Sequence, residues 1–371
     1  MRLFGILMYI LNNLFNPNLK MKRLFLIFLF ITSVAFTPGL TKKVSAQKTV
    51  NFNFDDFGEV TELKGEKLNL KHPLMNPLII ILSDTLLFIK NDKANPAVDV
   101  ISLNSGKTIA SFCRRGRGPG ELVAPFTVQY IEDDKSFLVQ DIIGRKVVYY
   151  DLDLILADAP KKYTRSVSFN RDIVWVRKVV EVKGGNLFCN LIGHEDGYMN
   201  CILTQGGEVV KFLDKYPEID LPFNPEEGSN IFGPLIGISS SRDKVIMPDN
   251  NSALISIYNT TGNKIIEFKG PDYKELDLIY KNGRTSLTNR NNCTYNHPSS
   301  NSSSFMIPYD GTKYKYAHSP AYNIFHLGFD GSLIEHFKIT PSVTNIAVDW
   351  EKSIIYGINK DIEPCIYKYE F

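Results

Sequence analysis

The stretch LLFIKNDKANPAVDVISLNSGKTIASF, residues 86–112, contains three short β-rich runs and decides the fold class. The runs cover residues 86–89, 98–101 and 108–112, and they are rich in the branched and aromatic side chains that favour strands. The turn before the third run contains Gly106, a residue type that accepts the positive φ angles of tight hairpins. The pattern therefore predicts antiparallel strands joined by short turns.

The same set of three runs recurs along the chain. A shorter strand precedes most sets, and in the fifth set we place the first run at residues 314–317. Recurring units with four short strands are typical of a β-propeller. We predict an all-β fold, a six-bladed β-propeller, with no convincing helix; a many-stranded two-sheet sandwich is the alternative. The middle runs begin at residues 98, 146, 198, 254, 323 and 365.

The two ends of the predicted propeller, residues 47–371, suggest how the ring closes. The sixth unit stops at Phe371 after three strands, whereas residues 49–57 form an alternating strand without a blade of its own. Because a bare sheet edge invites aggregation, we expect this N-terminal strand to close the last blade. The wide fourth spacing, between the middle runs that begin at 254 and 323, indicates a loop insertion at about 269–304, whose Asn- and Ser-rich tail, 289–304, is expected to be a mobile loop.

Residues 1–46 have the features of a secretory signal peptide. Met21-Lys22-Arg23 precedes an apolar run, residues 24–36, and Val44-Ser45-Ala46 supplies small residues at the −3 and −1 positions of a cleavage site. The run is shorter than the ~20 residues that span a bilayer, so cleavage after Ala46 is favoured over an N-terminal membrane anchor. We expect translation to start at Met21 and the protein to be exported to the periplasm, the cell envelope or the medium.

The composition limits the classes of partner. The hydrophobic content of 44% supports a large core, and the formal charge of +2 contains six basic residues from the first 46. The remaining chain has 36 basic and 40 acidic residues, or about −4, which argues against general nucleic-acid binding. We expect a monomer that is not an integral membrane protein after signal cleavage.

Five cysteines occur, and their spacing does not fit a zinc site. No cysteine precedes Cys113, so we expect no lipid anchor. Cys189 and Cys201 lie symmetrically about Glu195, which would place them opposite each other in a hairpin. The two alternatives are a disulfide between Cys189 and Cys201 and a pair of buried thiols.

A glycine-rich motif, Arg115-Gly116-Arg117-Gly118-Pro119-Gly120-Glu121, follows the first unit, with Asp141, Arg145 and Tyr150-Asp151 in the next. These residues resemble the TolB-like six-bladed β-propeller family of bacterial envelope proteins, which has a G-x-G-P-G-E loop between blades one and two. The residue-by-residue match to the family pattern is confined to about residues 105–151. Many relatives carry a lipidation cysteine that this sequence lacks. The resemblance implies a fold and an envelope location, and it implies no known reaction.

The glycine-rich loop has two interpretations. Phosphate-binding loops open a helix, but residues 122–125 lead into a strand, so nucleotide binding is not expected. The first interpretation is an inter-blade connection held by a Glu–Arg tie. The second is a ligand site that uses Arg115, Arg117 or Glu121.

The remaining candidates are histidines and one tyrosine. His194 lies in an exposed polar turn that could donate a ligand, although adjacent residues cannot all face one metal ion. His326 and His336 are expected to lie opposite each other as a solvated pair on two outer strands. His318 and Tyr322 lie near a turn and are ligand-binding candidates. No nucleophile motif is recognisable, so we assign no catalytic residue, no metal ligand and no cofactor.

Propeller topology predicts which face of the ring binds. The turn between the second and third strands of a blade and the connection to the next blade emerge on one side, which we call the loop face. The sequence supports three functions: a non-catalytic protein that binds a glycan, peptide or protein partner in the envelope, a lactonase- or lyase-like propeller enzyme with an axial metal, and an envelope scaffold protein. The loop face should comprise residues 91–96, 114–121, 142–144, 193–197, 249–252, 319–322 and 360–364.

Overall fold

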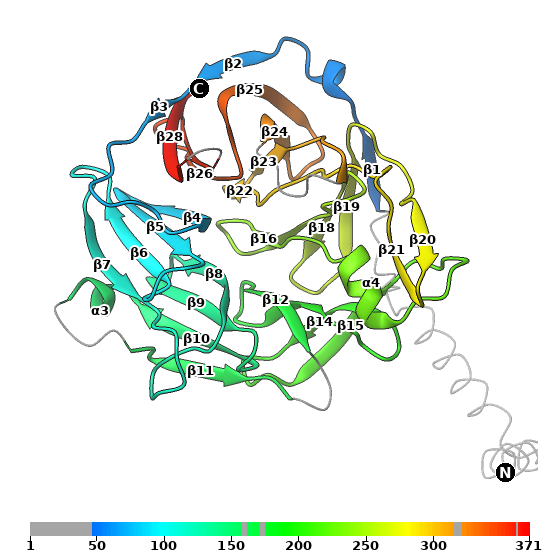
Figure 1. Ribbon diagram of the computed structural model, residues 1–371, viewed down its shortest axis with the longest axis horizontal. Coiled ribbons are helices and arrows are strands. Elements are labelled where there is room, and N and C mark those ends of the chain that lie inside the picture. Colours follow the sequence, from blue (N-terminus) through cyan, green and yellow to red (C-terminus); the bar gives the residue numbers. More distant parts are fainter. Residues whose placement is uncertain (1–46, 158–161, 171–174, 315–320, 361–362) are drawn as a thin grey trace, which may run out of the picture. The chain divides into compact units, whose positions relative to one another are not determined.

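The computed structural model describes residues 47–157, 162–170, 175–314, 321–360 and 363–371. The chain divides into two units, Met1–Ala46 and Gln47–Phe371. The predicted signal peptide and the start at Met21 lie outside the described residues. The second unit is a ring of six sheets around a central axis, which confirms the six-bladed β-propeller (Figure 1).

The first three blades are regular four-stranded antiparallel sheets. Each begins with its innermost strand and continues outward in chain order, as the recurring runs predicted. Blade 1 comprises β4 (Pro77–Ser83), β5 (Leu86–Asn91), β6 (Val98–Ser102) and β7 (Thr108–Phe112); blade 2 comprises β8 (Pro125–Ile131), β9 (Ser136–Asp141), β10 (Lys146–Asp151) and β11 (Arg165–Ser168); blade 3 comprises β12 (Val176–Glu181), β13 (Leu187–Leu191), β14 (Tyr198–Leu203) and β15 (Val209–Lys215).

The last three blades each gain a strand from the N-terminal segment. Blade 4 comprises β16 (Gly237–Ile238), β17 (Lys244–Pro248), β18 (Leu254–Asn259) and β19 (Lys264–Lys269), with β1 (Lys48–Asn51); blade 5 comprises β22 (Ser299–Ser300), β23 (Ser304–Tyr309), β24 (Ala321–Gly328) and β25 (Leu333–Val343), with β2 (Thr61–Lys64); blade 6 comprises β26 (Asn345–Asp349), β27 (Ile354–Asn359) and β28 (Cys365–Glu370), with β3 (Glu66–Lys67).

An N-terminal strand does close the last blade, but it is not the predicted one. β3 pairs antiparallel with β28, as Lys67 opposite Tyr367 shows. Residues 48–51, by contrast, add in parallel to β19 of blade 4, and β2 adds in parallel to β25 of blade 5. The expectation that 49–57 closes the last blade is therefore wrong. Residues 48–67, here called the strap, cover the outer edges of three blades in turn (Figure 1).

Aromatic side chains hold the strap in place. After β1 the chain forms a short 3-10 helix, η3 (Phe54–Phe57), instead of the predicted strand. Phe52 is 2% exposed and its ring lies 5.4 Å from that of Phe325, while the Phe57 ring stacks on Phe325 at 5.2 Å. The strap thus continues the hydrophobic core between blades 4 and 5.

The insertion between blades 4 and 5 is more ordered than its composition suggested. It contains a separate hairpin, β20 (Leu278–Lys281) and β21 (Arg284–Leu287). Its polar tail is packed, with Asn291 and Tyr295 0% and 2% exposed, and supplies β22. The expected mobile loop at 289–304 is therefore wrong, because Asn and Ser side chains there bond to buried backbone. The strand of blade 5 that pairs with β24 on its inner side is Ser304–Tyr309, whereas residues 315–317 of the predicted first run lie outside the described residues.

Two short α-helices among the described residues were not predicted from the sequence. α3 (Leu152–Leu156) follows β10, and the Asp151 carboxylate accepts a hydrogen bond from the Leu154 N–H at 2.9 Å. α4 (Pro225–Ile231) has a capping box between Asn224 and Glu227. Both are too short for a periodic pattern to reveal. Among the described residues, no helix is long and apolar enough to cross a membrane.

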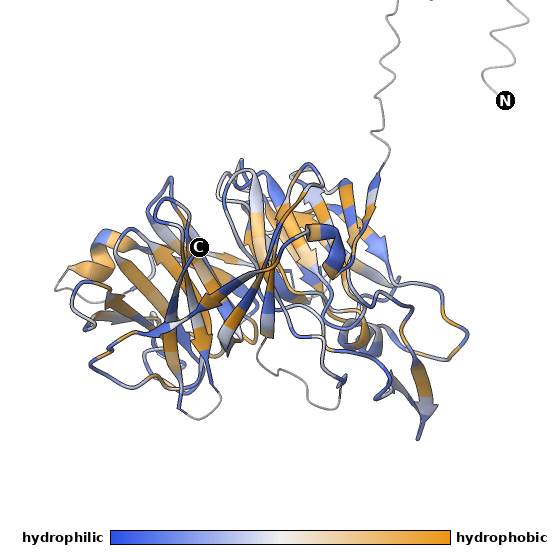
Figure 2. Cartoon of the chain, turned by 90° about the horizontal axis from the view of Figure 1, so that it is seen from above, coloured by the Kyte–Doolittle hydropathy of each residue, from blue (hydrophilic) through white to orange (hydrophobic). Residues whose placement is uncertain are grey.

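Packing between blades forms most of the core. The strands are largely hydrophobic and many of their connections hydrophilic, as Figure 2 shows. Between blades 1 and 2, the Phe88 and Phe137 rings lie 4.4 Å apart and the Phe112 ring lies 5.3 Å from Phe137. Each blade buries both of its faces in this way. Successive side chains along a strand therefore contact the two neighbouring blades in turn, instead of alternating between core and solvent.

A buried ion-pair network joins blades 2, 3 and 4 at the face opposite the loop face. The Glu181 side chain is 4% exposed and lies 2.8 Å from Arg242 Nη1 and 3.3 Å from Arg165 Nη2. The Tyr149 hydroxyl donates to the same carboxylate at 2.8 Å. Arg242 also contacts Asp133 at 2.8 Å, where the carboxylate is 78% exposed.

Replacing Phe52 by Ala should destabilise the fold by about 3–4 kcal/mol, since it removes a buried aromatic ring from the strap. Urea unfolding followed by tryptophan fluorescence measures the change. Glu59→Ala, at an exposed position of the same strap, should leave the free energy of unfolding almost unchanged. Equal stability of the two variants would contradict the structural role of the strap.

Replacing Glu181 by Ala should lower the free energy of unfolding by about 3–5 kcal/mol, because the partly buried Arg242 then lacks its buried carboxylate partner. Asp133→Ala removes the exposed partner of the same arginine and should cost less than about 1 kcal/mol. Thermal unfolding of both variants tests the difference. A similar loss in the two would show that burial of the carboxylate is not what stabilises the network.

Candidate functional site

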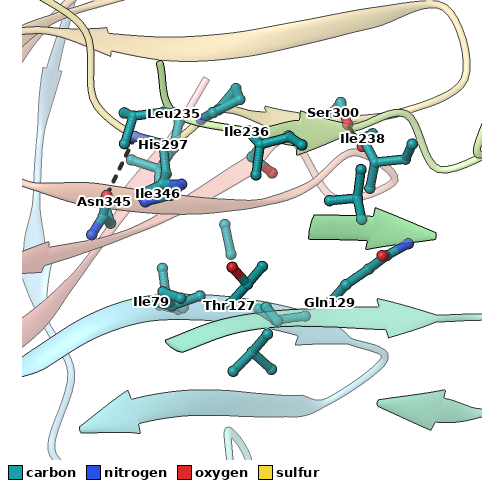
Figure 3. Close-up of a pocket in the computed structure, with 18 of the residues that line it drawn as sticks. Ile79, Thr127, Gln129, Leu235, Ile236, Ile238, His297, Ser300, Asn345 and Ile346 are labelled. Carbon is teal, nitrogen blue, oxygen red and sulfur yellow. Dashed lines mark hydrogen bonds between the residues drawn. The ribbon is translucent and has the colours of Figure 1, made fainter. Parts of the chain in front are cut away.

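A channel of about 840 Å³ follows the axis of the ring, lined by the innermost strands of all six blades. Figure 3 shows side chains from these strands converging on it, among them Ile79, Thr127, Ile236, Asn345 and Ile346. Each innermost strand starts at the loop face, so the first residues of the strands surround one opening. We call this opening the mouth.

The mouth collects basic side chains from blades far apart in the sequence. Arg177 and Lys178 lie near the start of β12, Lys90 lies near the end of β5, and Lys360 follows β27. His297 precedes β22 and lines the same opening. Among the described lining residues, the acidic one is Glu132, which follows β8 at the opposite end. The mouth is therefore electropositive.

Burial and mutual repulsion change the protonation of these groups. Burial, and then the charge of Arg177, lower the pKa of Lys178 to about 7. Burial, and then the charges of Lys178 and Lys90, lower the pKa of His297 to about 3. His297 is therefore neutral at neutral pH, while Lys178 is poised to gain or lose its proton.

One exposed carboxylate partly balances the other side of the mouth. Asp92 lies 3.5 Å from Lys90 and 3.6 Å from Arg115. Burial lowers the pKa of Lys90, with Asp92 opposing the shift and Arg115 adding to it. Burial also lowers the pKa of Lys360, which Asp92 again opposes. Three cations share this one carboxylate, so a net positive charge remains for a ligand.

Amide side chains complete the mouth. Asn76, Asn250, Asn296 and Asn345 line it. Asn345 accepts a hydrogen bond from the His297 backbone N–H at 3.4 Å and donates to the Leu78 carbonyl. The Asn250 Oδ1 and Asn296 Nδ2 atoms are buried without a hydrogen-bond partner in the described part of the chain. An unpaired buried polar atom costs about 1–3 kcal/mol, so both atoms favour a polar group in the mouth.

Hydrogen bonds between blades fix the wall of the channel. Each joins a side chain of one blade to the backbone of the next, so the mouth is held by rigid strands rather than by loops alone. The ties are Gln129 Nε2 to Glu181 O at 3.0 Å, Glu181 N to Gln129 Oε1 at 2.7 Å, Lys178 Nζ to Pro234 O at 3.1 Å, Ser300 Oγ to Ile238 O at 2.6 Å and Val348 N to Ser299 Oγ at 3.1 Å.

The glycine-rich loop lies at the rim and holds itself together. Glu121 accepts a hydrogen bond from the Gly118 N–H at 2.8 Å, and Gly120 has a φ of +81°. In the described residues Glu121 forms no ion pair with an arginine, so the expected Glu–Arg tie is replaced by this backbone bond. Arg115 donates to the Ala94 carbonyl at 3.2 Å and faces Asp92, whereas Arg117 is exposed.

Asp141 anchors the neighbouring turn. Its buried carboxylate accepts hydrogen bonds from the N–H groups of Val123 and Ala124, both at 2.9 Å, and of Gly144 at 3.0 Å. The Arg145 guanidinium lies 4.8 Å from the centre of the Trp175 ring. The Asp141 bonds connect this turn to the residues before β8, and the Arg145 contact reaches Trp175, just before β12 of blade 3.

The other predicted site residues are not gathered at the mouth. His194 packs against Phe212 with ring centres 4.5 Å apart, and its Nδ1 accepts from the Asp196 N–H at 3.2 Å. Tyr322 is 54% exposed at the second residue of β24. His318 lies outside the described residues. The ligand roles of Arg115, Arg117, Glu121, His194, His318 and Tyr322 stay predictions.

The two histidines of blade 5 do not form the expected solvated pair. The register places His326 opposite Glu335 and His336 opposite Phe325, so the two side chains lie on different faces of the sheet. His336 is 4% exposed, and its Nε2 lies 2.9 Å from Asn323 Oδ1. His326 Nε2 lies 2.9 Å from Ser304 Oγ.

Sequence reasoning missed the residues that line the mouth. Lys90, Arg177, Lys178 and His297 were not among the candidates, and Lys360 appeared only within a predicted face segment. One signal was present: Arg177 and Lys178 interrupt an apolar strand, Val176–Glu181. Two adjacent basic residues are unusual in a strand that is buried between neighbouring blades, but they do not show which side faces the axis.

All five cysteines are buried in the structure. Cys189 and Cys201 lie directly opposite each other across β13 and β14, as the symmetry of the sequence predicted. Burial, and then the contact with Cys201, raise the pKa of Cys189 well above its usual value. Among the described residues, no group of three His, Cys, Asp or Glu side chains could hold a metal ion.

Comparisons with known proteins show the fold alone. No family model matches the chain, and no curated protein matches it either. A solved structure from Bacteroides fragilis NCTC 9343, whose name describes an exported protein, superposes with a TM-score of 0.53 at 10% identity, covering 86% of this chain and 98% of the other. A member of the DUF4221 family from Bacteroides vulgatus gives 0.54 at 9% identity, covering 84% and 97%.

Thiol titration of the protein purified without reductant should find five reactive thiols after denaturation and almost none before it. Burial and the raised pKa of Cys189 keep the thiolate, the reactive form, scarce in the folded chain. Three thiols after denaturation would instead show that Cys189 and Cys201 form the cross-strand disulfide.

Proposed function

We propose that this protein is an exported, non-catalytic β-propeller that binds an anionic ligand at the mouth of its central channel. The observation that carries the proposal is the set of basic side chains around one opening, the buried Lys90 and Lys178 and the partly buried Arg177. Charged groups of one sign, held in a low-dielectric wall, attract and orient a ligand of the opposite sign.

The glycan, peptide or protein partner expected from the sequence would engage through a carboxylate, phosphate or sulfate group. Lys178 and Lys90 supply point charges, and Arg177 presents a planar donor group. The guanidinium of Arg177 also donates to the Ser229 carbonyl, which fixes its direction. Asn296, whose Nδ2 has no hydrogen-bond partner in the described part of the chain, lines the same channel.

The propeller-enzyme alternative calls for a different mouth. An axial metal in a lactonase- or lyase-like enzyme requires carboxylates, Asn or His from several blades to converge on the axis. Here lysine and arginine side chains converge instead, and they repel a cation. The scaffold alternative places the function on the outer loop face, where Arg117 and Tyr322 are exposed. Binding at the mouth accounts for the buried charges, which a scaffold role does not require.

Export and the TolB-like resemblance are parts of the proposal. The signal features of residues 1–46 and the motif at 116–121 support an envelope or periplasmic location. One of the two structural neighbours is named as an exported protein, which supports export. A monomer with no nucleic-acid partner is the simplest form of this function.

Replacing Lys178 by Met should weaken binding of an anionic ligand at least tenfold, because a charge-assisted contact is lost while the side-chain volume is kept. Calorimetric titration with phosphate, a diuronate and a short Asp/Glu peptide measures the change. Lys183→Met is the matched control, since Lys183 is exposed on the opposite face just after the same strand. Absence of any binding by the native protein, or unchanged binding by the Lys178 variant, would contradict the proposal.

Affinity for an anion should rise as the pH falls from 8.5 to 6. Lys178 has a pKa of about 7, so its charged form becomes the major one below that value, and the bound anion stabilises this form. Arg177 stays charged and His297 stays neutral across this range. The measurement uses the diuronate and the Asp/Glu peptide, whose carboxylates stay ionised across this range, because phosphate itself changes charge within it. With Lys178→Met the affinity for both should lose its pH dependence. An affinity that is constant with pH would assign the binding to other groups.

A further inference from the structure

The wall of the channel changes character beyond the mouth. The middle of the wall is aliphatic and is built by several blades. β4 contributes four partly buried aliphatic side chains that line the channel, Leu78, Ile79, Ile81 and Leu82, on either side of the buried Ile80. Blades 2, 3, 4 and 6 add the partly buried Ile238 and the mostly buried side chains of Val128, Val180, Ile236, Ile346 and Val348.

The polar side chains within this aliphatic zone already have partners. Thr127 donates to Gln140 Oε1 at 2.8 Å. The Gln129 amide uses both its donor and its acceptor on the Glu181 backbone, at 3.0 and 2.7 Å. Ser300 donates to the Ile238 carbonyl at 2.6 Å. A hydroxyl-rich ligand would therefore find few unused partners here, and burying its polar groups without partners would be costly.

From this arrangement we propose a ligand class for the channel: an anion with a straight aliphatic tail, such as a medium- or long-chain carboxylate. The anionic head lies among Lys178, Lys90 and Asn296 at the mouth, and the tail extends along the axis past Ile79 and Ile346. The inference rests on the proposed function and adds the chemical nature of the part of the ligand that follows its anionic group. It disfavours a glycan as the part of a ligand that enters the channel.

The dimensions of the channel suit such a tail. β4 has seven residues, so an innermost strand runs along the axis for about 20 Å at ~3.3 Å per residue. A straight aliphatic chain can lie along this length without entering the space between the blades. The tail would cover aliphatic surface that the neighbouring blades leave exposed to the channel, which is the source of the affinity.

The test is a chain-length series with one headgroup, measured below the micelle concentration. Calorimetric titration of the purified protein with butanoate, hexanoate, octanoate and decanoate should show affinity rising about two- to fourfold per added CH₂. Octanol, which has a tail and no charge, should bind at least tenfold more weakly than octanoate.

Two variants separate the tail from the head. Ile79→Thr keeps the branched shape and adds a hydroxyl to the wall, so it should flatten the chain-length dependence, with a loss of affinity that grows from butanoate to decanoate. Lys178→Met should weaken every member of the series by a similar factor. Ile109→Thr is the matched control, because Ile109 is 51% exposed on β7 outside the channel. Ile238→Thr serves the same purpose should Ile79→Thr not fold.

The outcomes distinguish the two proposals. Anion binding that depends on Lys178 but not on chain length would overturn the aliphatic ligand and leave the proposed function intact. Tighter binding of a diuronate than of decanoate would also overturn the aliphatic ligand and would favour a glycan, while the proposed function would stand. No binding of any anion would overturn both.

Discussion

The packing of each blade against its two neighbours is the interaction on which the rest of the molecule depends. The backbone ladders run within the blades, so the ring is joined mainly by apolar contact between sheets. Phe268 and Phe305, 6.0 Å apart at the junction of blades 4 and 5, are typical of it. The strap strengthens the same junction by placing Phe52 between Phe268 and Phe325. Closure thus involves three blades rather than one.

A closed ring brings the first residues of all innermost strands to one place. Lys90, Lys178 and Lys360 lie in blades 1, 3 and 6, and only convergence on the axis makes them neighbours. The polar ties between adjacent innermost strands hold this geometry, as the bond from Lys178 to the Pro234 carbonyl shows. The mouth is therefore a property of the closed ring, and no single blade contains it.

The sequence was sufficient for the blades because hairpin turns and apolar runs are local signals. Register was harder. A bulge between His326 and Leu327 shifts the pairing by one residue and sends His326 and His336 to opposite faces. The four residues of β1 carry no signal that distinguishes blade 4 from blade 6, because parallel addition at an outer edge depends on the path of the chain. The mouth could not be predicted, since it requires knowing which side of each innermost strand faces the axis.

The buried cations carry a cost that bears on their role. The pKa of Lys178 in the folded chain lies below its value in the unfolded chain, so the unfolded chain binds more protons between about pH 7 and pH 10 and stability rises with pH there. The proton on Lys178 therefore opposes folding. At the other end of the channel, Glu181 compensates Arg242 within 2.8 Å, which shows that this fold can pair a buried charge where pairing serves structure. Lys178 is instead left beside Arg177 and a neutral His297. A stability cost of this kind, held in place by rigid strands around one opening, is what a binding site for an anion requires, because the ligand supplies the missing charge.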